Sequence, residues 1–446
     1  MVENRTPNVS DNHDVKSRKK DVYIVSGART PFLKAKGKPN DFSASDLAVN
    51  CGKQLLLESD VPVSEIGEVV LGCANPSCDE ANIARLVALR LGIPENVPAW
   101  TVMRNCASGI QSIDSAYKDI QVGRHDLVLA GGTEAMSHSP LIFNKGMTNW
   151  FANLASQKTA IGKVKTMLGF RPSFLSPVIA LLHGLTDPFV AMNMGQTAEE
   201  LAYRFNISRE EMDEFSVASH NKLAEAIDNN FLTEINPLIS HKSGKVFETD
   251  EGLRRDVTLD KLNSLRPVFD KKFGNVTAGN SSQVTDGAAL VLLASEDAVK
   301  KYNLNVMAKI TDINWAGLNP KVMGLGPVYS TTDMLIRNNL GLNDIDFYEI
   351  NEAFATQVLA CKKAWEEDKF CQEELGLKGA FGSLDMDRLN IEGGAVAMGH
   401  PIAATGSRII LRLAKVLESH KGSKKKAVAT LCIGGGQGGS ILLETA

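Results

Sequence analysis

The sequence predicts a duplicated α/β fold, in which two mixed sheets are covered and separated by helices. Strand-like and helix-length segments alternate over the first 132 residues, and the same alternation returns in the last third of the chain. In both of these regions a chemically reactive residue precedes a helix that leads to a strand with a glycine-rich end. A length of 446 residues leaves room for two or three domains.

The first half begins with short apolar runs that are separated by segments of helix length. This alternation favours mostly parallel strands with helices on the faces of the sheet. We expect strands at 22–26, 68–73, 99–104 and 127–130, and helices at 45–59, 81–91 and 107–122.

The last third repeats this order of elements. Cys106 opens a helix that leads to a strand ending in two glycines, and His400 stands before a helix that leads to a strand ending in three. Such an echo predicts a duplicated fold with sites where the halves meet. We expect strands at 346–350 and 427–432, and helices at 331–339, 355–368 and 404–419.

Between the halves the alternation stops. Residues 197–230 have a helical pattern, with Ser208 and Glu211 as a capping box. We expect 133–265 to be a loop or lid excursion, after which the chain re-enters the sheet. The expected return strands are 276–278 and 288–294, and the expected units are a disordered tail at 1–20, an N-terminal domain at 21–300 and a C-terminal domain at 301–446.

The composition excludes several classes of protein. The chain carries 48 Lys and Arg against 52 Asp and Glu, a net charge of −4, which argues against a basic nucleic-acid binder. No run of about 18 apolar residues predicts a membrane helix. Seven cysteines without a CxxC pair argue against a disulfide framework or a structural zinc site, and favour reduced thiols in a cytoplasmic protein.

Cys106 is the first candidate for chemistry, because it follows a predicted strand and precedes a helix with Ile110, Ile113, Tyr117 and Ile120 on one face. The helix dipole and the free N–H groups at a helix N-terminus favour the thiolate, which is the nucleophile. The alternative is a small buried residue that fills a tight turn.

His400 lies in a stretch, 393–406, that is dense in small residues and therefore allows close backbone approach. Gly399 and Pro401 fix its backbone and aim its ring. A neutral imidazole there can deprotonate a thiol or donate a hydrogen bond to a developing oxyanion. The alternative is a core histidine that bonds the backbone.

Two further motifs lie at predicted strand ends. Cys432 is followed by a nearly all-glycine loop, 434–439, whose N–H groups can hold an anion. We set a phosphate loop aside because the GK[ST] ending is missing. Asn351 begins the run NEAF after a strand, where sites of such sheets lie, although alone it also fits a helix cap.

Together and in this order, these motifs resemble the thiolase family. The combination of the early cysteine, NEAF at 351–354, GHP at 399–401 and CxGG at 432–435 is specific, and the resemblance runs from about residue 21 to residue 444. Other phrases typical of the family are SGARTPF at 26–32, AGG at 130–132, LRPVFD at 265–270 and TAGNSS at 277–282.

The resemblance implies a role for each residue. Cys106 matches the nucleophile that carries the acyl group, and His400 matches the histidine that activates it and helps to form an oxyanion hole. Cys432 matches an acid/base at the substrate Cα, and Asn351 matches the asparagine that positions a water in that first hole. The backbone N–H groups of Cys106 and Gly434 match the second hole.

The activity that the resemblance implies is coenzyme A-dependent cleavage of 3-ketoacyl-CoA to acetyl-CoA and a shortened acyl-CoA, reversible as a Claisen condensation, through an acyl-cysteine. Coenzyme A is then a substrate, and no permanently bound cofactor or metal is expected. The chemistry needs a nucleophile at the ketone and a proton donor for the departing carbanion, which explains two cysteines. Alternatives are a biosynthetic acetoacetyl-CoA thiolase, a decarboxylating condensing enzyme, which needs no second thiol, and a non-catalytic acyl-CoA or lipid-binding protein.

Two departures from the family pattern concern the substrate. Ala403 stands where many members have glycine, and Asn193 stands where short-chain biosynthetic members often have histidine. The long segment after Ser137 resembles the thiolase subunit of bacterial fatty-acid-oxidation complexes, which implies a role in β-oxidation. The expected partners are other copies in a homodimer or homotetramer, and a hydratase/dehydrogenase subunit of such a complex.

Contacts to the rest of coenzyme A are also expected. Ser282 falls where the family contacts the pantetheine arm. The basic loop with Arg254, Arg255 and Lys261 offers the phosphates a positive landing site on an acidic protein, although a solvated run of charge is the alternative.

The segment 138–192 differs from the rest of the chain in its residue composition. It holds five Lys and Arg against Asp187 alone, and six aromatic residues. This predicts a mostly helical lid over the active-site mouth that contacts the acyl chain, a partner subunit or a membrane surface. The alternatives are an oligomer contact and a self-packed loop.

Overall fold

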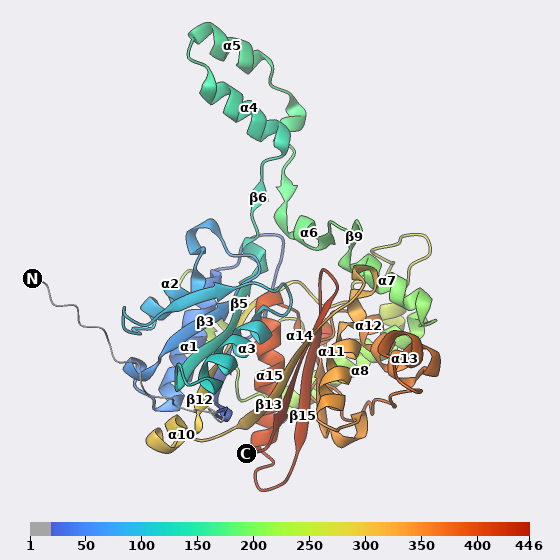
Figure 1. Ribbon diagram of the computed structural model, residues 1–446. Coiled ribbons are helices and arrows are strands. Elements are labelled where there is room, and N and C mark those ends of the chain that lie inside the picture. The colour runs from blue at the N-terminus through green and yellow to red at the C-terminus, as the bar shows by residue number, and fades with distance from the viewer. Residues whose placement is uncertain (1–18) are drawn as a thin grey trace, which may run out of the picture.

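The computed structural model describes residues 19–446, which form an α/β fold around one large mixed sheet (Figure 1). The tail expected at 1–20 lies, up to residue 18, outside the described residues. Nine strands follow the order β14-β15-β16-β13-β1-β12-β5-β3-β4, and β2 pairs with β12. The strands are β1 (Val22–Arg29), β2 (Leu33–Lys34), β3 (Glu68–Gly72), β4 (Ala99–Val102), β5 (Leu127–Ala135), β12 (Thr285–Ser295), β13 (Ala308–Gly317), β14 (Phe347–Ile350), β15 (Lys426–Ile433) and β16 (Gln437–Glu444).

The duplication is visible in the order of the strands. The path β3-β5-β12-β1 in the first half has the same pattern as β14-β15-β16-β13 in the second, with one parallel pair followed by antiparallel pairs. The two expected sheets are joined into one, because β1 and β13 pair over three residues of each strand. The prediction of mostly parallel strands is wrong, since only β3–β4, β3–β5 and β14–β15 are parallel.

Helices cover and separate the two halves of the sheet. The helices α3 (Ser108–Gln121) and α15 (Ile402–Glu418) pack together in a core cluster that draws strands from both halves. The helices α1 (Ala44–Ser59) and α2 (Ile83–Arg90) cover the other face of the first half.

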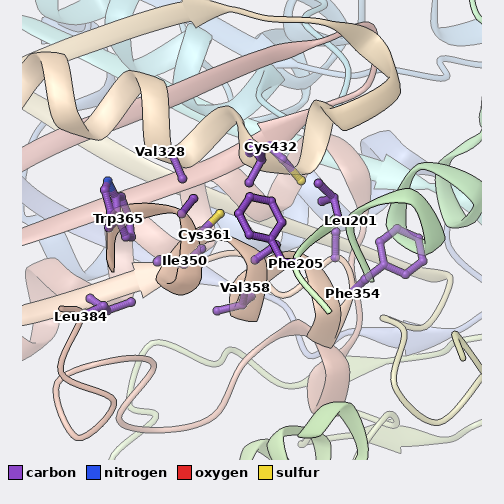
Figure 2. Packing of buried hydrophobic residues seen from close by; sticks show 14 of the residues in the cluster. Leu201, Phe205, Val328, Ile350, Phe354, Val358, Cys361, Trp365, Leu384 and Cys432 are labelled. Carbon is purple, nitrogen blue, oxygen red and sulfur yellow. The ribbon is translucent and has the colours of Figure 1, made fainter. Parts of the chain in front are cut away.

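The corresponding face of the second half is covered by α11 (Gly326–Arg337) and α12 (Ala355–Glu366). Figure 2 shows part of this cluster, in which Val328 of α11 and Trp365 of α12 lie near Ile350 of β14, and Cys432 belongs to the same cluster. The cysteine at the end of β15 is therefore built into a packed core rather than into a mobile loop.

The N-termini of α3 and α15 approach each other closely. A Cβ atom at Gly109 would lie 2.7 Å from the carbonyl oxygen of Ala403 and 2.8 Å from the amide nitrogen of Ser407. Only glycine allows this approach, which brings the helix ends that follow Cys106 and His400 together.

The excursion between the halves contains more structure than the sequence predicts. The helical segment 197–230 is two helices, α7 (Met194–Arg204) and α8 (Arg209–Asp228), and the capping box of Ser208 and Glu211 at the start of α8 is confirmed. Residues 276–278 form no strand, and the chain re-enters the sheet at β12. The remaining elements with described bounds include β10 (Leu238–Ile239), β11 (Val246–Phe247), α9 (Leu259–Asn263), α10 (Glu296–Tyr302), α13 (Asp368–Leu375) and α14 (Ala395–Met398).

Residues 145–177, named here the hairpin, project from the body on a stalk formed by β6 (Leu141–Ile142) and β7 (Val178–Ile179) (Figure 1). The hairpin contains α4 (Lys145–Ser156) and α5 (Ala160–Leu168), so its predicted helical character is confirmed. The prediction of a lid over the active-site mouth concerns the whole of 138–192. The hairpin part of this segment projects away from the body, whereas Leu182, Leu185 and Thr186 of the same segment line the cavity that contains Cys106. The aromatic side chains of the hairpin contact other residues of the hairpin. The Trp150 ring lies 5.2 Å from that of Phe170, and the Trp150 indole N–H donates to the carbonyl of Thr166 at 2.9 Å.

After the stalk the chain returns to the body. It forms α6 (Ala180–Gly184), then β8 (Thr186–Asp187) and β9 (Met192–Asn193), which pair with each other. Among residues 19–446, no helix combines the length and the apolar character that crossing a membrane requires.

Candidate active site

Cys106, His400 and Cys432 line one cavity of about 380 Å³, with Ser282 on its wall. Cys106 and Cys432 are 326 positions apart in the chain, and the close approach of α3 and α15 brings the helix starts beside Cys106 and His400 together. Most of the other lining side chains are apolar, among them Met136, Leu182, Leu185, Met194, Phe269, Val284, Met323, Phe354 and Ile402.

A tight turn presents the Cys106 thiol. Asn105 adopts a left-handed conformation, with φ 45°, and the amide of Ala107 donates to the carbonyl of Arg104 at 3.0 Å. The Asn105 side chain donates to the carbonyl of Gly434 at 2.9 Å. This hydrogen bond ties the turn before α3 to the glycine loop after β15, so the two motifs act as one unit.

Burial raises the pKa of the Cys106 thiol above its ordinary value, although the backbone N–H groups of Gly434 and of Cys106 itself act in the opposite direction. The N–H groups at the helix N-terminus thus act in the expected direction and favour the thiolate, but the effect of desolvation on the thiol pKa is larger. The same two N–H groups are the donors that we expect to stabilise the oxyanion that forms on the carbonyl oxygen of the acyl group attached to Cys106.

His400 is held with one nitrogen free. Its Nδ1 lies 2.6 Å from the hydroxyl oxygen of Thr405, and that hydroxyl donates to the carbonyl of Pro401 at 3.0 Å. Because the hydroxyl proton is used, Nδ1 is the donor to Thr405 and Nε2 carries the lone pair. Nε2 is buried without a hydrogen-bond partner in residues 19–446, and burial lowers the pKa of His400 to about 4. His400 is thus a neutral base.

Cys432 lies at the end of β15 and is 1 % exposed. Burial raises the pKa of its thiol well above the ordinary value, and the neighbouring Cys106 sulfur adds to that effect. A thiol that stays protonated at neutral pH beside a nucleophile is suited to donate a proton to a carbanion.

Two family models match nearly all of the described chain. The thiolase N-terminal domain matches residues 22–297, and the thiolase C-terminal domain matches residues 304–445. The chain belongs to the thiolase family. Membership confirms the resemblance seen in the motifs and makes this thiolase an acyltransferase.

Relatives and solved structures support the same assignment. This thiolase is 38% identical to a probable acetyl-CoA acyltransferase of Staphylococcus aureus (strain COL), over 93% of this chain and 97% of the relative. It matches human mitochondrial 3-ketoacyl-CoA thiolase in complex with CoA at 36% identity and a TM-score of 0.81, over 96% of this chain and 98% of that one. It matches an acetyl-CoA acetyltransferase of Bacillus anthracis at 34% identity and a TM-score of 0.81, over 97% of this chain and all of the other.

Three of the expected site residues of this thiolase do not line the cavity, namely Asn351, Arg254 and Gly434, and Gly434 lines a neighbouring cavity instead. Asn351 follows β14 and is fully buried, and within residues 19–446 its side-chain amide has no hydrogen-bond partner. Its neighbours Ala353 and Phe354 reach the cavity, but the Asn351 side chain is not part of the wall. Arg254 is exposed and also lies outside the cavity wall.

Sequence reasoning missed the residues that hold the reactive groups in place. Thr405 fixes the tautomer of His400, and Glu134 accepts hydrogen bonds from the amides of Ala74, Asn75 and Ala403 at 3.0, 3.0 and 3.2 Å. Burial raises the pKa of Glu134 to about 7. A carboxylate inside the apolar run of β5 was the available signal for Glu134.

Proposed function

We propose that this thiolase cleaves 3-ketoacyl-CoA with coenzyme A in fatty-acid β-oxidation, and that Cys106, His400 and Cys432 carry the reaction. The observation that supports this most is a single cavity lined by two protonated thiols and a neutral imidazole. The mostly apolar wall suits an acyl substrate, and a cytoplasmic location stays a prediction.

In the first half-reaction the Cys106 thiol gives its proton to Nε2 of His400, and the sulfur attacks the C3 carbonyl. The N–H groups of Cys106 and Gly434, or His400, stabilise the oxyanion. The C2–C3 bond then breaks, and Cys432 protonates the departing carbanion to give acetyl-CoA. The acyl group remains on Cys106 as a thioester.

In the second half-reaction a new coenzyme A enters the cavity. Its thiol gives a proton to the Cys432 thiolate and attacks the acyl-Cys106 carbonyl. Cys106 leaves as a thiolate and takes the proton back from His400, so both cysteines return to their starting state. Asn351, buried behind the wall, is proposed to orient His400 through a water rather than to touch the substrate.

Ser282 and the basic loop are proposed to make the outer contacts of coenzyme A. Ser282 lines the cavity, which supports a contact with the pantetheine arm. In the basic loop, Arg255 pairs with Asp228 at 2.7 Å and Lys261 pairs with Asp256 at 2.6 Å. These pairs favour Arg254 as the cation of this loop that meets the phosphates.

A biosynthetic acetoacetyl-CoA thiolase is the second candidate, because the match to the Bacillus anthracis acetyl-CoA acetyltransferase is as good in TM-score as the match to the human 3-ketoacyl-CoA thiolase. Chain length separates the two candidates. Coenzyme A-dependent thiolysis should be measured with acetoacetyl-CoA, 3-ketodecanoyl-CoA and 3-ketohexadecanoyl-CoA. A β-oxidation enzyme turns over the longer substrates, whereas a biosynthetic enzyme acts on acetoacetyl-CoA alone.

Cys106→Ala tests the chemistry itself. We expect this variant to lose turnover on every substrate while it still binds coenzyme A in calorimetry, because the nucleophile is separate from the pantetheine contacts. Mass spectrometry should find an acyl adduct on the wild type and none on the variant. An adduct on Cys106→Ala at wild-type stoichiometry would show that another residue carries the acyl group.

Assembly is the remaining part of the proposal. We expect at least a homodimer, formed through the free edge of the sheet at β4. We also expect the hairpin to bind a surface outside the active site, either a membrane or a hydratase/dehydrogenase subunit.

A further inference from the structure

A second cavity meets the catalytic cavity at Cys106. It measures about 210 Å³ and lies under α6 and the turn that follows it. Both cavities are lined by Cys106, Leu185, Thr186, Met194 and Ile402. His400, Cys432 and Ser282 line only the first cavity. The second cavity has its own wall of Ala74, Asn75, Asn105, Ala180, Leu181, Gly184, Asp187, Pro188, Gly434 and Gly435.

The chemistry of the proposed reaction requires two directions from the sulfur. When Cys106 attacks C3, that carbon carries two arms, the CH2–CO–S–CoA group and the alkyl chain. The first arm must face Cys432, which protonates C2, and Ser282, so it lies in the first cavity. The alkyl chain leaves the same tetrahedral carbon in another direction.

The second half-reaction strengthens this requirement. Coenzyme A must reach the thioester of acyl-Cys106 while the alkyl chain is still attached. A chain in the first cavity would compete with the incoming pantetheine arm, and the conflict would grow with chain length. A chain in the second cavity leaves the first one open to coenzyme A.

We propose that the second cavity binds the alkyl chain of the 3-ketoacyl substrate and of acyl-Cys106, and that α6 sets the accepted chain length. This inference rests on the proposed thiolysis of 3-ketoacyl-CoA. The polar wall, with Asn105 and Gly434, lies beside the reacting carbonyl, and the apolar side chains of Leu181, Leu185 and Pro188 follow the chain outward.

The wall under α6 is built as a fixed surface. The buried carboxylate of Asp187 accepts the amides of Phe189 and Val190 at 2.8 and 3.1 Å, which holds the turn after α6. Ala180 follows β7 directly, so the cavity reaches the base of the stalk. The segment around the stalk thus contributes to the substrate site through α6 and not through the hairpin.

Filling the second cavity tests the inference. Ala180 and Gly184 are four residues apart on α6, so their side chains share one face. Apart from its chain neighbours and the backbone of α6 itself, a Cβ atom at Gly184 meets no other atom of residues 19–446 within 4 Å, and Gly184 is absent from the residues with positive φ. Gly184→Leu and the double variant Ala180→Leu/Gly184→Leu should therefore fold.

We expect kcat/KM for 3-ketohexadecanoyl-CoA to fall at least tenfold in these variants, with acetoacetyl-CoA turnover within twofold of wild type and the KM for coenzyme A unchanged. Gly317→Leu is the matched control, because Gly317 is exposed at the end of β13 and its Cβ position is equally empty. It should leave all three values unchanged. A long-chain rate that stays at the wild-type value in both variants, or a short-chain rate that falls equally, overturns the inference.

Photocrosslinking gives an independent readout. A fatty acyl-CoA with an ω-diazirine acylates Cys106 by thioester exchange, in which coenzyme A leaves with the cysteine proton. After irradiation, we expect crosslinks in residues 180–188. Crosslinks confined to Phe269, Met323 or Phe354 would place the chain in the first cavity and overturn the inference. If the wild type forms the acyl-enzyme and gives only these first-cavity crosslinks, the chain-length inference fails but the proposed thiolysis still holds. If the wild type cleaves no 3-ketoacyl-CoA at all, the proposed function fails as well.

Discussion

Burial leaves the three reactive side chains uncharged in the resting site. It raises the pKa of both thiols and lowers the pKa of His400 to about 4. At pH 7 the pair of Cys106 and His400 is therefore a thiol and an imidazole and not an ion pair. The thiolate forms as its proton moves to Nε2 during attack, when the N–H groups of Cys106 and Gly434 can stabilise the developing charge on the substrate oxygen.

Alkylation of Cys106 tests this charge state. Because only the thiolate reacts, and the pKa lies above its ordinary value, the rate with iodoacetamide should rise about tenfold per pH unit between pH 6.5 and 8.5. Peptide mass spectrometry measures the rate, with the exposed Cys78 of the same sample as the reference thiol. A plateau for Cys106 below pH 8 would indicate a stabilised thiolate and contradict the assignment.

Cys432 and His400 should act in different steps. We expect Cys432→Ser to slow exchange of the acetyl-CoA methyl protons with solvent deuterium by about 100-fold or more, because a serine hydroxyl is a far weaker acid than a thiol. Acylation of Cys106 should slow much less in this variant. His400→Ala should slow acylation itself, since Nε2 is the group that takes the thiol proton. NMR measures the exchange, and wild-type exchange in both variants would refute the role given to Cys432.

The sequence identified the reactive residues but not the residues that fix their positions by hydrogen bonds. Cys106, His400 and Cys432 could be predicted because each stands at an element boundary among small residues. The roles of Thr405 and Glu134 could not be predicted, since they depend on hydrogen bonds that only the fold creates, although the carboxylate of Glu134 inside an apolar strand is a visible signal. The bond from the amide of Ala403 to Glu134 spans 269 positions of the chain.

The hairpin is the element whose position differs most from expectation. Its aromatic side chains interleave with lysines in the sequence, which predicts a contact surface, but nothing in the pattern says which way the stalk points. In the structure the aromatic rings pack within the hairpin, while Ile161 and Leu168 of α5 are 84 % and 83 % exposed. The hairpin holds five Lys and Arg and no Asp or Glu. An apolar helix face with only positive charge around it favours an anionic membrane surface over a protein partner.

Deletion of Thr148–Pro177 tests this role. Ile142 of β6 pairs with Val178 of β7, so the chain before and after the deleted segment already runs side by side in the stalk. We expect wild-type acetoacetyl-CoA turnover and loss of cosedimentation with phosphatidylglycerol vesicles, which salt should also reduce in the intact protein.

Ile161→Ser/Leu168→Ser, with the charges kept, should weaken vesicle binding without changing turnover. Neutral phosphatidylcholine vesicles serve as the lipid control. If the intact protein does not bind anionic vesicles but binds a hydratase/dehydrogenase subunit, the hairpin is a protein-docking element and the membrane prediction is wrong.

The sequence predicted strands correctly where the apolar runs are continuous. The prediction failed where polar residues or glycines interrupt the runs. The strands β3, β5 and β15 begin within a residue or so of their expected positions. Neither β13, which is interrupted by polar residues, nor β16, which starts Gln-Gly-Gly, was expected. These two strands give the second half its antiparallel pairs. The preference for parallel strands came from the first half and failed there because the return strand β12 pairs antiparallel with both β5 and β1.

In the whole molecule, the two halves of the sheet differ in the strand that forms their outer edge. The first half ends in β4, whereas the second half has only a single bridge, between Tyr348 and Leu389, in the corresponding place. Within residues 19–446 the strand β4 pairs with a strand on its β3 side alone, and the Asn82 side chain donates to the carbonyl of Ala99 in this strand, so its other edge has no partner strand. Such an edge is normally covered, and in a homo-oligomer a second copy covers it with the same strand.

We therefore expect a homodimer that pairs β4 of one copy with β4 of the other. Trp100 in β4 and Met103 just after it are 37 % and 65 % exposed, and a shared interface would bury both. Met103→Lys places like charges beside each other across the two-fold axis, so it should raise the dimer dissociation constant at least tenfold in light scattering coupled to gel filtration. Leu57→Lys is the matched control, because Leu57 is an exposed apolar residue of α1 and should leave the constant unchanged. A wild type that stays monomeric at micromolar concentration, or a Met103→Lys variant as tightly associated as Leu57→Lys, would rule out β4 as the interface.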